Sequence, residues 1–221
     1  MPEFWQKTHK RGMETVTFWR KFFPLMSVAG TGVDQHAANL DQLGRLAQER
    51  ENRKTAAKQM KNTELAQFAA IRTLNLAVPQ LITAQFDESH PVRQSLAAVF
   101  TIVPRSDALN LRRARILIPI WKQANAELAK RPSGTAIMRD TTDVAAFEQM
   151  VMRYPERLQE TSDAEAALTS ARGALRIFCR QVDRMNKRAY LKFSAEARTD
   201  ATVREVLLAS ITREKPSHKR A

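Results

Sequence analysis

The chain has 221 residues, long enough for one sizeable domain, and 43% of them are hydrophobic, which is enough to build a core. Only six are glycines, which argues against a turn-rich β protein, and the abundant Ala, Leu, Arg, Lys, Gln and Glu favour helices. A formal net charge of +13 suggests a polyanion as partner, but the basic residues are spread along the chain rather than gathered in one block. Composition therefore predicts a basic, mostly helical protein and identifies no function.

Cysteine content and hydropathy bear on localisation. Cys179 is the only cysteine, so no intramolecular disulfide can form, and this fits a reducing cytoplasm. No stretch reaches the ~18 apolar residues of a membrane span. Basic residues interrupt every apolar run near the N-terminus, so we expect no signal peptide and a cytoplasmic protein.

Residues 1–30 form a basic, aromatic segment. It holds six of the fifteen aromatic residues: Phe4, Trp5, Phe18, Trp19, Phe22 and Phe23. The two later pairs are four residues apart and would share one helix face. Two interpretations are favoured, a terminal helix packed on the rest of the chain and a non-native extension of about 25 residues, because an aromatic stripe is more often packing than an anchor. A helix that docks on a membrane surface or a partner stays open as the alternative.

Residues 33–86 are predicted to form one very long helix or two collinear ones. Apolar residues recur at steps of three and four at both ends of this stretch. Its middle is polar nearly all round and carries oppositely charged residues four apart, which support a solvated helix. Pro79 is predicted to kink the helix.

Residues 97–121 allow two interpretations. Their β-branched and aromatic residues could form a hairpin of two strands. Pro119 would then lie inside the second strand, and apolar residues continue beyond it at helical spacing. We therefore expect a helix over about 106–130, capped by Ser106 or Asp107.

The C-terminal half is predicted to hold a loop and three helices. Residues 131–141 contain the strongest turn signal and should form the loop. Thr142 or Asp143 should cap a helix to about residue 160. Ser162 begins an S-x-x-E capping box, which indicates a separate helix over 162–198. A short last helix should follow a cap at Thr199 or Asp200, ahead of a polar tail.

A heptad pattern in this last long segment sets the expected packing. Seven apolar residues alternate at steps of three and four: Leu168, Ala171, Leu175, Phe178, Val182, Met185 and Ala189. Such a seam keeps one side of a helix against a partner helix. We therefore expect an all-α fold, an antiparallel bundle of about four long helices with coiled-coil-like packing, plus short terminal helices.

These elements predict three regions: an N-terminal extension at 1–30, the bundle at 31–199, and a short helix with a polar tail at 200–221. The first long helix, about 80 Å if straight, would outrun partner helices of about 25–35 residues. Self-association follows as an expectation, because the excess length needs another surface.

Two groups of basic residues are candidate nucleic-acid contacts. One is the cluster of Arg112, Arg113 and Arg115; the other is a row at steps of four: Arg172, Arg176, Arg180, Arg184, Arg188 and Lys192. The row rises about 30 Å but sweeps roughly 200° around its helix, so it forms no straight rail for phosphates. The favoured interpretation of both groups is a solvated helix surface.

No catalytic, metal or cofactor motif is present. The four histidines have no partner at metal-ligand spacing, and no nucleophile motif occurs. We expect a non-enzymatic scaffold or protein-interaction protein that self-associates, without cofactor or small-molecule substrate. The alternatives are nucleic-acid binding through the dispersed Arg and Lys residues and docking on a membrane surface through residues 1–30.

Overall fold

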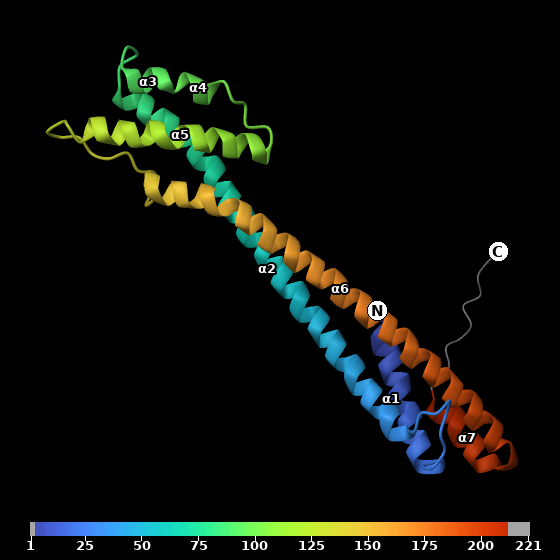
Figure 1. Cartoon of the computed structure of the whole chain (residues 1–221). Helices are drawn as coiled ribbons and strands as arrows, with labels where there is room; N and C mark the ends of the chain where they lie inside the picture. Colours follow the sequence, from blue (N-terminus) through green and yellow to red (C-terminus); the bar gives the residue numbers. More distant parts are fainter. Residues whose placement is uncertain (1–2, 212–221) are drawn as a thin grey trace. The chain divides into compact units, whose positions relative to one another are not determined.

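The computed structural model describes residues 3–211, and their regular secondary structure is helical. The predicted all-α class is confirmed. In chain order the elements are α1 (Phe4–Phe22), α2 (Val33–Gln85), α3 (Pro91–Ser95), α4 (Ala97–Phe100), α5 (Asp107–Leu128), α6 (Val144–Glu196), the 3-10 helix η1 (Ala197–Thr199) and α7 (Ala201–Ser210) (Figure 1).

The number of long helices differs from the prediction. Instead of about four, the described residues contain one pair, α2 and α6, of 53 residues each. The predicted division of α6 into 143–160 and 162–198 is wrong, although Pro155 lies inside the helix. Residues on both sides of the predicted break, Tyr154, Thr161 and Leu168, are buried, and their packing outweighs a capping box worth about 1 kcal/mol.

Most other helix boundaries follow their local signals. The helix predicted at 33–86 is α2, and the helix predicted at 106–130 is α5, so the hairpin alternative does not occur. The predicted caps Ser106, Asp143 and Asp200 each accept a hydrogen bond from a backbone N–H in the first turn of the following helix. These side chains occupy N–H groups that have no partner inside the helix.

Residue contacts divide the chain into two compact units. Unit 1 comprises residues 1–55 and 165–221, and unit 2 comprises residues 56–164. Each unit therefore takes part of α2 and part of α6. This division differs from the expected ranges 1–30, 31–199 and 200–221, because contacts group α1 and the first part of α2 with the last part of α6 and α7. The predicted polar tail after residue 211 lies outside the described residues.

The core of unit 1 includes the aromatic residues of α1. Phe18 and Trp19 are buried, and both rings lie 5.4 Å from the ring of Phe193 on α6. Gly12 lets α1 approach α2 closely, since a Cβ there would lie 2.2 Å from a side-chain methyl of Leu40. Residues 3–30 thus contribute to the core of unit 1.

The C-terminal part of the heptad seam of α6 faces the same core. Five members of the seam are buried, and of these Leu175, Val182 and Ala189 belong to this core. The other two, Phe178 and Met185, are half-buried and pack against it. Coiled-coil-like packing around the seam stays a prediction.

The core of unit 2 is built from α3, α4 and α5 with the adjoining parts of α2 and α6. Trp121 is fully buried, its ring lies 5.7 Å from that of Phe147, and its Nε1 donates a hydrogen bond to the carbonyl oxygen of Ile137. The backbone N–H of Ile137 in turn donates to Asn125 Oδ1. These two bonds fasten the loop at 131–141 to α5.

Candidate polyanion-binding face

Five arginines of the α6 row are exposed and have no acidic partner in the part of the chain that the structure describes. They are Arg172, Arg176, Arg180, Arg184 and Arg188. No carboxylate among residues 3–211 lies within ion-pair distance of any of them. Lys192, the last member of the row, is also exposed and donates a hydrogen bond to the carbonyl oxygen of Ser27.

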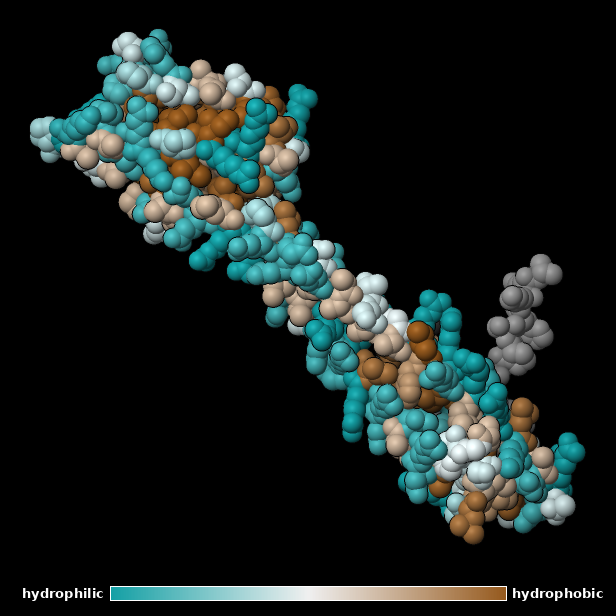
Figure 2. All heavy atoms as spheres, viewed as in Figure 1, coloured by the Kyte–Doolittle hydropathy of each residue, from teal (hydrophilic) through white to brown (hydrophobic). Residues whose placement is uncertain are grey.

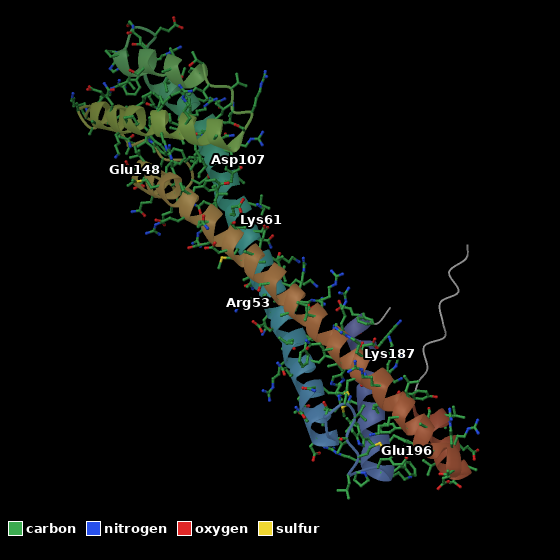
Figure 3. The ribbon with its side chains drawn as sticks, turned by 45° about the vertical axis from the view of Figure 1, so that its right-hand side comes forward. Arg53, Lys61, Asp107, Glu148, Lys187 and Glu196 are labelled. Atoms are coloured by element: carbon green, nitrogen blue, oxygen red, sulfur yellow. The ribbon has the colours of Figure 1, made fainter. Side chains whose placement is uncertain are left out.

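The acidic residues around the row explain why it stays uncompensated. Residues 166–195 hold seven basic side chains and one acidic side chain, Asp183. Asp183 is buried and already paired, with Arg11 at 3.4 Å and with Lys187 at 2.7 Å. Lys187 lies on α6 (Figure 3), and its side chain is 57% exposed. The surface of this part of α6 is therefore strongly positive.

The three middle arginines of the row lie on one side of α6 because of helix geometry. Each step of four residues rises about 6 Å and advances about 40° beyond a full turn. Arg176, Arg180 and Arg184 therefore span about 12 Å and about 80°, whereas all five arginines sweep about 160°. We call these three residues the basic face. Arg172 and Arg188 lie at its flanks, nearer the core.

A pocket of about 400 Å³ opens beside one end of the row. It is lined by residues of α1, α2 and α6 and the N-cap of α1: Glu3, Phe4, Trp5, Arg50, Arg172, Leu175, Arg176 and Cys179. Arg50 Nη2 pairs with Glu3 at 2.9 Å and with Glu51 at 2.6 Å. The hydrogen bond from Arg50 lowers the pKa of Glu3 to about 2.

Cys179 is the only thiol that could serve as a nucleophile in this pocket, and it is poorly suited to that role. Its side chain is buried, and burial raises the pKa of the thiol. A neutral thiol is a weak nucleophile and a poor metal ligand. The cysteine therefore contributes an apolar wall to the pocket.

The other predicted basic cluster does not form one surface. Arg112 and Arg115 are exposed, but Arg113 is 6% exposed and donates from Nη1 to the carbonyl oxygen of Ile102. Burial lowers the pKa of Arg113. The three arginines therefore do not share one exposed surface, because the position of Arg113 on the inner side of α5 directs it into unit 2. The favoured interpretation of a solvated helix surface does not hold for Arg113, and nucleic-acid contact through Arg112 and Arg115 stays a prediction.

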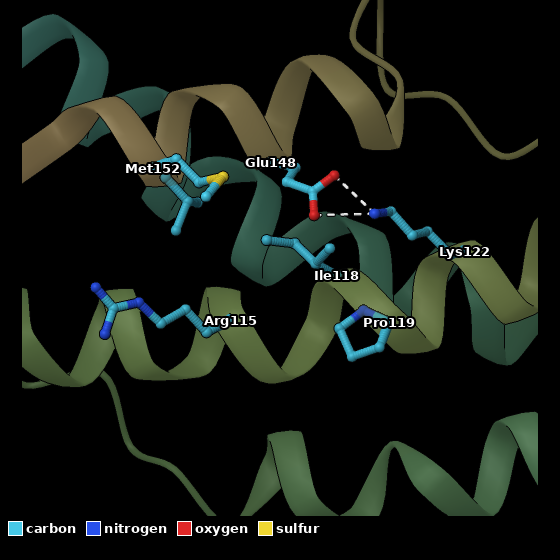
Figure 4. Close-up of a pocket in the computed structure, with 7 residues that line it drawn as sticks. Arg115, Ile118, Pro119, Lys122, Glu148 and Met152 are labelled. Carbon is cyan, nitrogen blue, oxygen red and sulfur yellow. Dashed lines mark hydrogen bonds and ion pairs between the residues drawn. The ribbon is translucent and has the colours of Figure 1, made fainter.

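A second groove, of about 520 Å³, lies between α5 and α6 in unit 2 (Figure 4). Lys122 and Glu148 form an ion pair of 2.7 Å at one end, and Arg115 lies at the other. Met152 is 72% exposed beside it. Figure 2 shows hydrophobic residues gathered on this face of unit 2, with hydrophilic residues across and around them. The groove is apolar, with charged ends.

One buried polar contact joins three helices of unit 1. His36 is fully buried, and its Nε2 lies 2.8 Å from Asn186 Oδ1, while Asn186 Nδ2 donates to the carbonyl oxygen of Thr8. Burial lowers the pKa of His36. Sequence reasoning missed this contact, because nothing local relates residues 150 positions apart.

Comparisons with known proteins assign no activity. The chain matches no family model, no curated protein and no solved structure. Within residues 3–211 no group of three or more His, Cys, Asp or Glu side chains is arranged to hold a metal ion. None of the helices in that range is both long and apolar enough to cross a membrane. A functional proposal therefore depends on the geometry of the two units.

Proposed function

We propose that unit 1 binds the phosphate backbone of nucleic acid through the basic face, Arg176, Arg180 and Arg184. One observation carries the proposal: three exposed guanidinium groups lie on one side of one helix without a carboxylate partner among the described residues. Guanidinium groups bind phosphate oxygens in a bidentate manner, and binding releases the counterions condensed on the nucleic acid.

The test compares duplex DNA binding by the natural chain and by a triple variant, Arg176→Gln, Arg180→Gln, Arg184→Gln. Fluorescence anisotropy over a range of salt concentrations gives both the affinity and its salt slope. Loss of three phosphate contacts should reduce the slope of log K against log salt by about 2.7 and weaken binding by roughly two orders of magnitude at about 0.1 M salt.

The matched control removes the same charge elsewhere. Lys58, Arg72 and Arg153 are exposed residues of unit 2, and their triple change to Gln leaves the same net charge. If both triple variants lose the same affinity, binding follows net charge alone and the basic face is not the site. No binding by the natural chain at low salt would also refute the proposal.

We propose self-association as a second candidate function, on a different basis from the one expected. The two long helices have equal length, so no excess length requires a second copy. The supporting observation is instead the apolar groove of unit 2 beside Met152, which is 72% exposed. Exposed apolar surface of this kind marks interaction sites.

Light scattering after size exclusion tests this candidate over a range of protein concentrations. A mass that rises with concentration should return to the monomer in Met152→Glu, because a buried charge opposes association. Met60→Glu, at an exposed position of unit 2 outside the groove, should associate as before. A monomer mass at every concentration would exclude self-association through the groove.

The burial of the central aromatic residues of α1 argues against docking on a membrane through them. Phe18 and Trp19 lie in the core of unit 1. Insertion of these rings into a membrane surface would first remove them from that core.

A further inference from the structure

The pocket beside the row combines aromatic rings with uncompensated positive charge. Phe4 is 52% exposed, Trp5 is partly exposed, and both line the pocket with Arg172 and Arg176. Leu175, which is 5% exposed, adds an apolar wall. Such a site offers a flat apolar surface and two guanidinium groups within one cavity.

The other charged groups of the pocket compensate one another. Glu3 accepts hydrogen bonds from Arg50 and from Trp5 Nε1, the latter at 2.8 Å. Arg50 also pairs with Glu51. Because these charges are internally satisfied, the positive charge left for a ligand is that of Arg172 and Arg176. The matching ligand is an anion that carries a flat ring.

We propose that this pocket receives an unpaired nucleotide of a single strand, its base against Phe4 and Trp5 and its phosphate on Arg172 and Arg176. This inference rests on the proposed function, because the same strand continues over the basic face. Nucleobases stack on aromatic side chains regardless of sequence, and arginines hold the backbone between stacked bases.

The curvature of the row favours a single strand over a duplex. All five arginines sweep about 160° around α6. A duplex is stiff, with a persistence length of about 50 nm, and can contact the basic face without following the turn. A single strand bends within a few nucleotides, so it can reach Arg172 and the pocket while its next phosphates contact Arg176 and Arg180.

Tryptophan fluorescence gives a direct readout of the pocket. The chain has three tryptophans, and Trp19 and Trp121 are both fully buried, so stacking by a ligand can reach Trp5. Addition of an oligothymidylate of twelve nucleotides should quench the fluorescence of Trp5, and the quenching should saturate. Trp5→Phe should abolish the quenching, and the unpaired strand should bind more tightly than a blunt duplex of equal length.

Phe4→Ala tests the stacking itself. It should weaken single-strand binding about tenfold, because the base loses one of its two stacking rings. Phe100→Ala is the matched control, because Phe100 is 54% exposed and lies in unit 2. Equal loss in the two variants, or a parallel tenfold loss of duplex binding in Phe4→Ala, would overturn the stacking site.

The outcomes separate this inference from the proposed function. Duplex binding through the basic face without quenching of Trp5 refutes the pocket and leaves the proposed function standing. Absence of binding to both strands and duplexes refutes both. Thymidine monophosphate tests whether the ligand is a free nucleotide or part of a strand. Equal affinity for the mononucleotide and the oligonucleotide would assign the pocket to free nucleotides and refute the proposed binding of a single strand.

Discussion

His36 is a buried imidazole at the junction of α1, α2 and α6, held by Asn186 and close to Trp19, whose ring centroid lies 6.1 Å away. Desolvation disfavours its charged form, so the pKa of His36 lies below its ordinary value of 6.5 in the folded chain. The unfolded chain therefore binds a proton that the folded chain excludes as the pH falls through 6.5.

The free energy of unfolding should consequently decrease as the pH falls below about 6.5, by at most about 1.4 kcal/mol per pH unit from this residue. Urea unfolding between pH 5 and pH 8 measures it. His36→Gln should lose this part of the pH dependence, while His9→Gln, a change at a half-buried residue of α1, should retain it. Equal pH profiles for the natural chain and His36→Gln would contradict the assignment.

At the scale of elements, the contact of α1 with α2 depends on Gly12. A methyl group there would meet Leu40, which is fully buried and cannot swing into solvent. Gly12→Ala should therefore destabilise the chain by about 1–3 kcal/mol through overpacking, despite the better helix propensity of Ala.

The sign of this effect should reverse when Leu40 is shortened. In a Leu40→Ala background the methyl group has space, so Gly12→Ala should stabilise by up to about 1 kcal/mol. Gly44→Ala on α2, where a Cβ meets nothing within 4 Å, should stabilise the natural chain similarly. Chemical denaturation of the natural chain, the two single variants Gly12→Ala and Leu40→Ala, and the double variant measures the coupling energy between the two positions. Additive effects on the free energy of unfolding would show that the two helices do not meet at this point.

Helix boundaries were predictable where they depend on residues a few positions apart. The caps at Ser106, Asp143 and Asp200 needed no tertiary information. The capping box at Ser162 predicted a helix start that does not occur. A capping box depends only on residues within one turn, so it does not reflect the burial of the residues before and after it.

For the whole molecule, the net charge of +13 should oppose compaction at low ionic strength. The midpoint of thermal unfolding should therefore rise by a few degrees between about 0.01 M and about 0.1 M salt, over which the Debye length falls from about 30 Å to about 10 Å. Circular dichroism follows the transition. The triple variant at Arg176, Arg180 and Arg184 should show a smaller rise of this midpoint with salt. A midpoint that falls as salt increases would show that repulsion between positive charges is not the dominant electrostatic effect.

The candidate site could be predicted only in part. The row of arginines and the seam on the other side of the same helix were visible in the sequence, since both follow from helical periodicity. The pocket was not, because its walls come from residues 3–5, from Arg50 and from residues 172–179. The burial of Arg113 between the exposed Arg112 and Arg115 could not be predicted either, because the sequence does not show which side of α5 is buried.

The amino-acid sequence by itself determined the helical class, most helix ends and the positive charge, because these depend on composition and on contacts within about four residues. The tertiary structure decided that α6 continues past Pro155, that the arginines of its outer side have no acidic partner among the described residues, and that aromatic rings of α1 lie beside them. Those features depend on burial and on contacts between residues more than a hundred positions apart, where local propensity has no influence.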